Sequence, residues 1–462
     1  MTELHVVVLA AGKGTRMKSA RPKVLHPLAG RPLIEHVLGT AHSLDVTETV
    51  IVVGHGADDV RAALAHHDNL RFVVQSPQLG TGHALLQTES ALAGRGGTVL
   101  LLYADVPLLE AGTLRRLLET HRAARAAATV LTAELADPDG YGRIIRDQSG
   151  ELARIVEERD ASAAERAVRE VNSGIYALEL GPLFESLHQL ATDNAQGEYY
   201  LTDLVAQYRK RRLPLATLRV TDPGELRGVN SRVDLAELSA VLHQRKCREL
   251  MLGGVTLEDP ASTYVDADVT VGEDTTIAPG VRLTGRTIIG QRCHVHSGSR
   301  ISDSTLGDDV TVLDGCLVEQ STVGSLVSLG PFARLRPLSE VGDGAHIGNF
   351  VELKKTRFGA RSKAGHLAYL GDAIVGEDVN VGAGVITCNF DGVQKHLTII
   401  EDGVFVGSNS QLVAPVTIGK GAYVAAGSSV TESVPPDALA IARAQQTNKP
   451  GWAASRRKRN KD

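Results

Sequence analysis

The 462-residue chain has few aromatic side chains, since Phe, Tyr and Trp make up 4% of it and there is a single Trp. Cysteine is scarce as well: the four cysteines, Cys247, Cys293, Cys316 and Cys388, show neither CxxC pairs nor the spacing of zinc ligands. These absences argue against a disulfide-dense secreted scaffold. We expect reduced, mostly buried thiols in a reducing compartment, which indicates a cytoplasmic protein.

Long hydrophobic runs and a strong excess of one charge are also missing. The first apolar run, His5–Ala10, is too short for a signal peptide, and no segment reaches the ~20 apolar residues of a membrane span. The formal net charge of −5 gives no general attraction to nucleic acid or to anionic membrane. The basic tail Arg456–Lys461 is the one local exception, and we interpret it as a solvated terminus rather than a nucleic-acid site.

Glycine, by contrast, is abundant at 47 residues, and the length of the chain predicts two or three domains. In the first half, short β-rich runs alternate with segments of helical periodicity. This alternation predicts a mostly parallel sheet covered on both faces, with ligands at the carboxyl ends of the strands. The predicted strands are His5–Ala10, Val50–Val53, Arg71–Gln75, Val99–Tyr103 and Ala128–Ala133.

The second half has a six-residue period. Seven aliphatic residues recur at this spacing from Val265 to Ile301, and the period returns at 329–353 and 406–430. Because neither an amphipathic helix nor a plain sheet has this period, it predicts a left-handed parallel β-helix with the aliphatic residues pointing inward. The period breaks near Leu306, Phe358 and Leu397, where we expect loops to protrude.

Residues 231–252 read as one helix that ends at Gly253-Gly254 and connects the two halves. We therefore predict three segments: an N-terminal domain over residues 1–230, a helical linker over 231–252, and a hexapeptide-repeat domain with its tail over 253–462.

A glycine-rich loop, Leu9–Met17, directly follows the first predicted strand. Glycine lets backbone N–H groups approach phosphate oxygens, and Lys13 and Arg16 add positive charge. The loop lacks the spacing of a Walker A motif, and a simple turn is the alternative. Lys23 supplies a further cation. Asp105 ends an apolar strand, where it is either an Mg²⁺ ligand or a helix N-cap.

Between Arg334 and Tyr369 the second half is dense in Arg, Lys, Glu, His and Tyr, which an oligomerisation rod does not require. His366 is the candidate general base, because imidazole can take a proton from an amine that attacks a thioester. Glu352 is available to orient it. The alternatives are a purely structural solenoid and a metal site that uses His346 and His366, with His396 in a loop.

Together the LAAGKGTRM loop, Tyr141-Gly142-Arg143, Asn172-Ser173-Gly174 and Gly228-Val229-Asn230 resemble the sugar-1-phosphate nucleotidyltransferases. More closely, the whole chain resembles the family of bifunctional N-acetylglucosamine-1-phosphate uridyltransferases and glucosamine-1-phosphate N-acetyltransferases. The resemblance implies a Rossmann-like α/β nucleotidyltransferase domain followed by the β-helix.

For the first half the resemblance implies a UTP and UDP-N-acetylglucosamine site with Mg²⁺. Arg16 and Lys23 would neutralise the triphosphate, and Asp105 and Asn230 would hold the metal. The implied binding residues are Leu9, Ala10, Ala11, Gly12, Lys23, Gln75, Gly80, Thr81, Tyr103, Ala104, Asp105, Gly142, Glu157, Asn172 and Asn230.

For the second half it implies His366 as the base in acetyl transfer, with Glu352 beside it. Glucosamine-1-phosphate would be bound by Arg336, Lys354, Tyr369 and Asn380, and acetyl-coenzyme A by Ala383, Asn389, Phe390, Ser408, Ala426 and Arg443. The family usually has Tyr where Phe390 stands. Loss of that hydroxyl removes one hydrogen bond worth ~1 kcal/mol, so we expect modestly weaker binding.

The expected function is synthesis of UDP-N-acetylglucosamine by acetyl transfer followed by uridylyl transfer, as used in cell-wall construction, in a homotrimer assembled through the β-helix. Two alternatives stay open. The solenoid could serve only as a trimerisation module beside a uridyltransferase, or the protein could be a regulatory binder of sugar nucleotides. The combination of Arg16, Lys23, Asp105 and Asn230 argues against a mere binder, because binding alone needs no metal pair.

Overall fold

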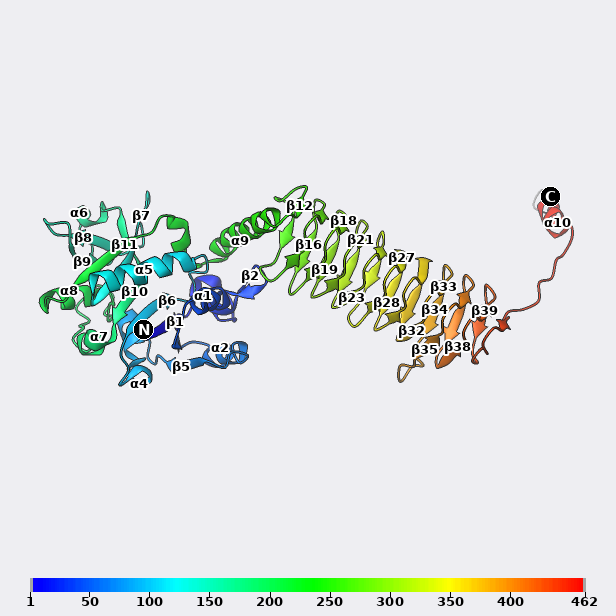
Figure 1. Ribbon diagram of the computed structural model, residues 1–462, viewed down its shortest axis with the longest axis horizontal. Coiled ribbons are helices and arrows are strands. Elements are labelled where there is room, and N and C mark those ends of the chain that lie inside the picture. The colour runs from blue at the N-terminus through cyan, green and yellow to red at the C-terminus, as the bar shows by residue number, and fades with distance from the viewer. Residues whose placement is uncertain (1–2, 460–462) are drawn as a thin grey trace. The chain divides into compact units, whose positions relative to one another are not determined.

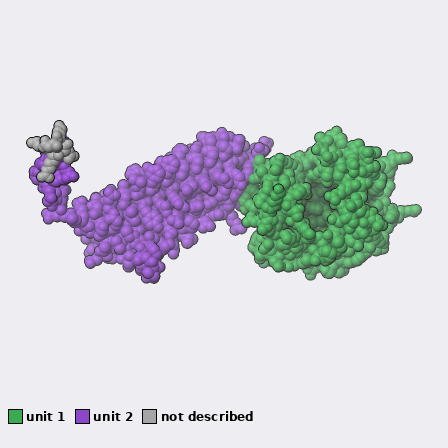
Figure 2. All heavy atoms as spheres, turned by 180° about the vertical axis from the view of Figure 1, so that it is seen from behind, with its two compact units in different colours: residues 1–242 green, residues 243–462 purple. Residues whose placement is uncertain are grey.

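The computed structural model describes residues 3–459 and divides into two compact units, residues 1–242 and 243–462 (Figure 2). The division lies inside one long helix, α9 (Arg232–Leu252). Each unit has hydrophobic clusters of its own, and each is described separately. The predicted boundaries at residues 230 and 253 remain a prediction, and Lys461 of the basic tail lies outside the described residues.

Unit 1 is built on one nine-stranded sheet (Figure 1). Its strands are β1 (Leu4–Ala10), β4 (Glu48–Val53), β5 (Leu70–Val74), β6 (Thr98–Tyr103), β7 (Ala128–Glu134), β8 (Arg143–Arg146), β9 (Leu152–Val156), β10 (Glu170–Glu179) and β11 (Leu215–Arg219). The main path is β11-β7-β10-β6-β1-β4-β5. The strands β6, β1, β4 and β5 are parallel, as predicted, whereas β10 runs antiparallel to both of its neighbours on this path and carries the β8–β9 hairpin.

Strand β1 is buried along its whole length, which explains its nearly continuous apolar sequence. Val6 and Val8 contribute to one hydrophobic cluster, and Val7 and Leu9 to another on the opposite face. Helices α1 (Leu33–His42), α2 (Ala57–Ala63) and α5 (Ala111–Ala124) supply side chains to the first cluster. The second cluster receives side chains from α3 (Thr81–Leu86), α4 (Glu89–Leu92), α7 (Leu180–Leu187) and α8 (Asp203–Lys210).

Short elements complete unit 1, and two of them carry residues that matter below. These are the 3₁₀ turns η1 (Thr15–Met17) and η2 (Lys23–Leu25). The others are β2 (Pro27–Leu28), β3 (Arg31–Pro32), α6 (Ala163–Arg166) and η3 (Pro223–Leu226).

Unit 2 is a parallel β-helix in which short strands build three sheets (Figure 1). Sheet C runs from β12 (Thr256–Leu257) to β41 (Leu439–Ala440), sheet D from β13 (Tyr264–Val265) to β40 (Ser429–Val430), and sheet E from β14 (Thr270–Val271) to β38 (Val416–Ile418). Each strand pairs in parallel with the strand one coil further along. The periodic aliphatic residues form a single core, in which only Val271 is partly exposed. The predicted six-residue period is therefore confirmed.

The breaks in this period have two different causes. From Ile301 to Leu306 and from Leu353 to Phe358 the chain is one residue shorter between inward side chains, and no loop protrudes. The shortened corners place Asp303 and Lys355 at φ 47° and 49°, a left-handed conformation that turns the chain tightly. The prediction of loops at these two positions was wrong, because a missing residue disturbs the period as much as an inserted one.

Near Leu397 there is a true insertion. Residues 389–397 lie between β34 (Ile386–Cys388) and β35 (Thr398–Ile400), and a bridge between Phe390 and Lys395 closes the loop.

The second half of α9 belongs to unit 2 and covers the first coil. Cys247 and Leu250 are buried in the β-helix core, and His243 Nδ1 lies 2.8 Å from the carbonyl oxygen of Val265. The His243 ring also packs on Tyr264, with 3.7 Å between ring centroids. Beyond the last coil, α10 (Trp452–Arg459) ends the described chain.

Candidate functional site

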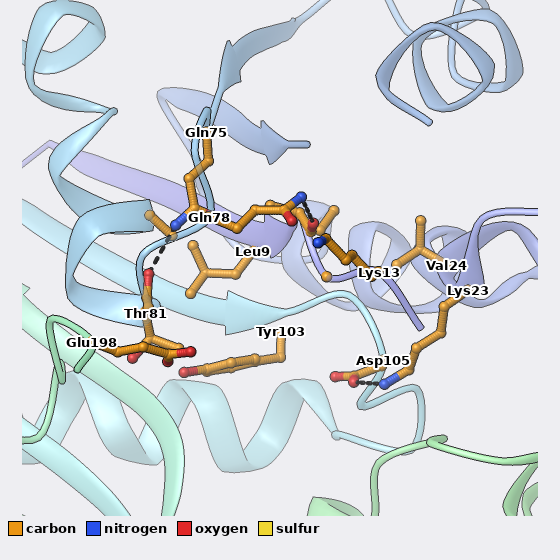
Figure 3. A pocket seen from close by; sticks show the side chains of 15 residues that line it. Leu9, Lys13, Lys23, Val24, Gln75, Gln78, Thr81, Tyr103, Asp105 and Glu198 are labelled. Carbon is orange, nitrogen blue, oxygen red and sulfur yellow. Dashed lines mark hydrogen bonds and ion pairs between the residues drawn. The ribbon is translucent and has the colours of Figure 1, made fainter. Parts of the chain in front are cut away.

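A cavity of about 330 Å³ opens at the carboxyl ends of β1 and β6 (Figure 3). These strands are neighbours, and Leu9 and Tyr103 are paired in register. The cavity is lined by Leu9, Ala10, Ala11, Gly12, Lys13, Lys23, Val24, Gln75, Gln78, Gly80, Thr81, Ala84, Tyr103, Asp105 and Glu198. Most of the residues predicted to hold the nucleotide therefore lie in one place.

Two glycine turns shape the cavity. Gly14 has φ 58°, and a Cβ on it would lie 2.6 Å from the Cβ of Lys23, so only glycine lets the loop pack against that lysine. Gly80 has φ 102°, and a Cβ on it would lie 2.7 Å from the carbonyl oxygen of Tyr199. The side chain of Gln75 donates to the carbonyl oxygen of Gly80 at 2.9 Å. These contacts fix the loop backbone that a ligand would meet.

Gln78 and Glu198 are cavity residues that the sequence prediction missed. Gln78 Nε2 donates to the carbonyl oxygen of Ala11 at 2.9 Å and so joins the two glycine turns. Its position between Gln75 and Gly80 could have identified it. Glu198 comes from a segment far along the chain, and no local pattern indicates its position.

Four polar side chains predicted to act together converge at one rim of the cavity. Lys23 Nζ contacts the Asp105 carboxylate and lies 3.0 Å from Asn230 Oδ1, while Arg16 Nη2 donates to the same oxygen at 2.9 Å. Figure 3 shows Lys23 and Asp105 pointing toward each other. The N-cap alternative for Asp105 is not supported, because α5 begins at Ala111 and its N-cap residue is Glu110.

These residues fit a divalent cation. Asp105 and Asn230 present one carboxylate and one amide oxygen to a common point, which the Lys23 ammonium approaches from the cavity side. Mg²⁺ in nucleotide sites takes one or two protein oxygens and completes its shell with phosphate oxygens and water. Asp105 and Asn230 could therefore hold Mg²⁺ at the point where the Lys23 ammonium contacts both of them.

A second cavity of about 310 Å³ shares Tyr103 and Asp105 with the first and extends to Tyr141, Ser173 and Asn230. The predicted sugar-binding residues lie close to one another. A Cβ on Gly142 would lie 3.6 Å both from Glu157 Oε2 and from the Cβ of Asn172.

Burial governs the ionisation of groups near this second cavity. The pKa of Tyr103 is raised by burial and by the carboxylates of Glu157 and Asp105, so the phenol stays protonated and can donate a hydrogen bond. Burial also raises the pKa of Glu157, and nearby Asp203 raises it further, although Thr202 donates to its carboxylate at 3.0 Å.

Glu157→Gln is expected to stabilise unit 1 near neutral pH. The folded state holds the proton of Glu157 more tightly than the unfolded chain does, so stability is lost as pH rises from the ordinary pKa of 4.5 through the raised value. The stability gained from the glutamine amide should therefore be present at pH values above the raised pKa of Glu157 and should vanish below pH 4.5. Denaturant unfolding at both pH values measures it, with the exposed Glu119→Gln as control. An equal effect at both pH values would contradict the assignment.

In unit 2, the β-helix register lines up the predicted acetyl-transfer residues. Asn349 is paired with His366. In the same sheet C, the inward residues Ile347, Ala364, Val381, Val406 and Val424 form one column of paired positions. Two residues beyond these inward positions stand Asn349, His366, Ala383, Ser408 and Ala426. The candidate base and three predicted coenzyme residues thus occupy one file on the corner between sheets C and D, one coil of ~4.8 Å apart.

From Ala383 to Ala426 the residues of this file have small side chains, and this row of small residues is called the track below. Backbone bonds tie successive coils together: Asn409 N–H donates to the carbonyl of Ala383, and Gly427 N–H donates to that of Ser408, each at 2.8 Å. Arg443 comes next, and its Cδ lies 4.0 Å from a Cβ built on Gly427. The track suits a long, extended ligand with an anionic end.

His366 has a different partner from the one predicted. Its Nδ1 lies 2.7 Å from Asn349 Oδ1, whereas Glu352 accepts from Arg336 Nη1 at 2.9 Å. The prediction that Glu352 orients the imidazole was wrong, because the register pairs Asn349 with His366 on sheet C and Glu352 with Tyr369 on sheet D. With Nδ1 donating to Asn349, the lone pair of Nε2 is available to accept a proton.

Sheet D presents the cationic residues. Arg336, Lys354 and Gly371 succeed one another in register on three coils. Lys395, which the sequence prediction missed, lies beside Lys354. The pKa of Lys395 is lowered because its neutral amine can accept a hydrogen bond from the Lys354 ammonium, and because two ammonium groups would repel each other. Cations held this close favour a bound anion such as a phosphate.

The remaining predicted residues are distributed over two faces. Asn380 lies on sheet C, in register with Lys363 and Phe405. In the inserted loop, Phe390 is 59% exposed, and the nearby Asn389 is buried with its Nδ2 2.6 Å from Asp372 Oδ2. Within residues 3–459 of one chain, no group of three possible metal ligands includes His346, His366 or His396.

Fold and site together define a two-part transferase, in which a nucleotidyltransferase sheet with a glycine-rich loop is joined to a hexapeptide-repeat β-helix. Family models agree: residues 6–197 match the MobA-like NTP transferase domain, 265–387 the GMPPB C-terminal domain, and 397–432 the bacterial transferase hexapeptide (six repeats). The last match supports a left-handed β-helix.

Curated relatives cover the full length of the chain. The bifunctional protein GlmU of Pelobacter propionicus is 49% identical over 99% of this chain and 100% of its own length. The GlmU proteins of Trichlorobacter lovleyi, 52% identical over 98% of both chains, and Koribacter versatilis, 50% identical over 99% and 98%, are similarly related. The chain belongs to the GlmU family of bifunctional enzymes.

No helix in the described part of the chain is long and apolar enough to cross a membrane. All four cysteines are free thiols, and three of them are buried.

Proposed function

We propose that the β-helix unit acetylates glucosamine-1-phosphate from acetyl-coenzyme A, and that unit 1 couples the resulting N-acetylglucosamine-1-phosphate to UTP. The products would be coenzyme A, UDP-N-acetylglucosamine and pyrophosphate. The convergence of Arg16, Lys23, Asp105 and Asn230 at the cavity rim is the observation that carries the first activity. The file from His366 to Ala426 supports the second.

In uridylyl transfer, a phosphate oxygen of the sugar attacks the α-phosphorus of UTP as the bond to the bridging oxygen breaks and pyrophosphate leaves. The attacking phosphate is already anionic, so no general base is needed. Arg16 and Lys23 neutralise the charge that builds up on the phosphates. Asp105 and Asn230 would hold Mg²⁺, which when bound supplies further charge neutralisation. Gly142, Glu157 and Asn172 would position the sugar, and the Leu9–Gly12 loop, Gln75, Gly80 and Thr81 the nucleotide.

In acetyl transfer, the amine of glucosamine-1-phosphate attacks the thioester carbonyl. His366 Nε2 takes the amine proton, the carbon–sulfur bond breaks, and coenzyme A leaves as a thiolate that gains a proton. Arg336 and Lys354 would bind the phosphate, with Tyr369 and Asn380 beside them. The corner file, with Asn389, Phe390 and Arg443, would bind acetyl-coenzyme A.

The test is an assay with glucosamine-1-phosphate, acetyl-coenzyme A, UTP and Mg²⁺ that follows free thiol and pyrophosphate separately. Both should be released, and pyrophosphate should depend on thiol release unless N-acetylglucosamine-1-phosphate is supplied. If pyrophosphate is released when N-acetylglucosamine-1-phosphate is supplied but thiol is never released, the β-helix is only a scaffold.

An apolar edge on the β-helix supports assembly into a homotrimer. One equivalent position recurs in each coil at the corner between sheets C and D. In the early coils this position is a glycine, as at Gly315, whereas in the next three coils it is Phe332, Phe350 and Leu367. All three have positive φ, which is unfavourable for bulky residues, and are 52%, 56% and 62% exposed. Phe332 and Phe350 stack at 5.4 Å. A second copy packed on this edge would bury them.

A trimer also accounts for the distribution of acetyl-transfer residues. The cations of sheet D and Asn380 of sheet C lie on different faces, on either side of the His366 corner. A site that uses all of them can be completed by a neighbouring copy in the groove between two prisms.

We expect light scattering to give a mass three times the 49.0 kDa of the chain. Replacing Phe332, Phe350 and Leu367 together with serine should lower the mass and abolish thiol release while leaving pyrophosphate release within about twofold. Val233→Ser, at an exposed position on α9, is the control. A triple variant that remains a trimer would contradict this interface. The free, mostly buried thiols support the cytoplasmic location that we propose.

A further inference from the structure

A histidine cluster lies on unit 1, outside the cavities of the nucleotide site. Within residues 3–459, one group of at least three His, Cys, Asp or Glu side chains has its ligand atoms within 4.8 Å of one another, and it consists of Glu35, His66 and His67. Glu35 is in the first turn of α1, and the two histidines follow α2. None of the three lines either cavity of the nucleotide site.

We propose that Glu35, His66 and His67 bind a divalent transition metal of the Zn²⁺ class. Two imidazoles and one carboxylate form a common ligand set for Zn²⁺. Mg²⁺, the cation proposed for uridylyl transfer, instead takes oxygen ligands. The cluster therefore selects a different metal from the one at Asp105.

The spacing of the ligand atoms fits a tetrahedral ion. His66 Nε2 and His67 Nε2 each lie 3.2 Å from the same carboxylate oxygen, Glu35 Oε1. Two ligands that are each ~2.0–2.1 Å from Zn²⁺ at a tetrahedral angle are about 3.3 Å apart. Small movements of three side chains would therefore admit the ion, with both histidines binding through Nε2.

The surroundings position the ligands and leave one side open. Glu35 and His67 are largely covered, with 15% and 24% of their side chains exposed, while His66 is 59% exposed. The rings of His66 and His67 are 4.2 Å apart, and His42, from the last turn of α1, packs edge-on against His67 at 5.8 Å. Three protein ligands and a solvent side would leave the fourth position to water.

Metal binding would join α1 to the turn after α2. The experiment is calorimetric titration of the tag-free full-length protein with Zn²⁺ in excess Mg²⁺. We expect one saturable site that depends on these residues, with affinity falling at least ~10-fold in His67→Ala and in His66→Ala. Zn²⁺ at tenfold excess over its dissociation constant should raise the unfolding midpoint of the wild type by about 3–5 °C and that of the variants less.

His188→Ala is the matched control. His188 Nε2 lies 3.0 Å from Glu89, the same ring–carboxylate contact without a second histidine, so Zn²⁺ binding should not change. Co²⁺ should give the visible absorption of a tetrahedral site in the wild type and in His188→Ala but not in Glu35→Gln. Zn²⁺ affinity that is unchanged in both His66→Ala and His67→Ala would overturn the proposal and leave the cluster as ion pairs only. Unchanged uridylyl transfer would show that the variants fold.

Discussion

Replacing His366 with alanine should reduce acetyl transfer by about 10²–10⁴-fold, the usual contribution of a general base. The amine loses its proton acceptor, while the coenzyme track at Ala383, Ser408 and Ala426 is unchanged. Uridylyl transfer should stay at the wild-type rate when N-acetylglucosamine-1-phosphate is supplied. Thiol release and pyrophosphate release, measured separately on the same preparation, give the two rates.

The control for this variant is His346→Ala, which removes another histidine of sheet C, one coil earlier. His346 is paired with Lys363 rather than with a file residue, so acetyl transfer should persist. Asn349→Ala should cause a smaller loss than His366→Ala, because it frees the ring without removing the base. Undiminished thiol release in His366→Ala would show that the β-helix uses another base or none.

Asp105→Asn should reduce uridylyl transfer by about 10²–10³-fold, comparable to the loss of one preorganised electrostatic contact at a transition state. The substitution keeps the shape of the side chain but removes the negative charge that faces Lys23, and it leaves Mg²⁺ a neutral amide oxygen in place of a carboxylate oxygen. Acetyl transfer should be unaffected. Pyrophosphate release as a function of Mg²⁺ concentration is the measurement, and the variant should need more Mg²⁺ for half-maximal rate.

Asp139→Asn is the matched control, since Asp139 lines the second cavity without belonging to the Lys23–Asp105–Asn230 cluster. It should change the rate by no more than a few-fold. An Asp105→Asn enzyme with an unchanged rate and Mg²⁺ requirement would remove this carboxylate from the mechanism.

Much of the architecture could be predicted because it follows from the regular spacing of apolar residues in the sequence. The buried residues of β1 and the inward residues of the β-helix follow directly from apolar spacing. The meeting of Lys23 with Asp105 could be expected as well, because parallel neighbours end at the same side of a sheet. Asn230 joins them from a distant segment, and only the family resemblance pointed to it.

Details of the sites depended on register, which spacing alone does not determine. Because some corners are one residue shorter, the coil that follows Asn349 has seventeen residues rather than eighteen, so His366 pairs with Asn349 and not with Gly348. Glu352 lies on the next sheet and pairs with Tyr369. Lys395 was missed for another reason, since it lies in the irregular insertion, where no period applies. The antiparallel course of β10 likewise had no signal in its sequence.

The burial of Cys247 and Leu250 beneath the first coil bears on how the acetyltransferase half could be produced alone. A fragment starting at Gly253, after the helix, would uncover the end of the apolar core and the outer edges of the first strands, which invite edge-to-edge aggregation. A fragment starting at His243 would keep the part of α9 that covers them. The second half of this helix should therefore protect the first coil from aggregation, and a truncated acetyltransferase half should include it.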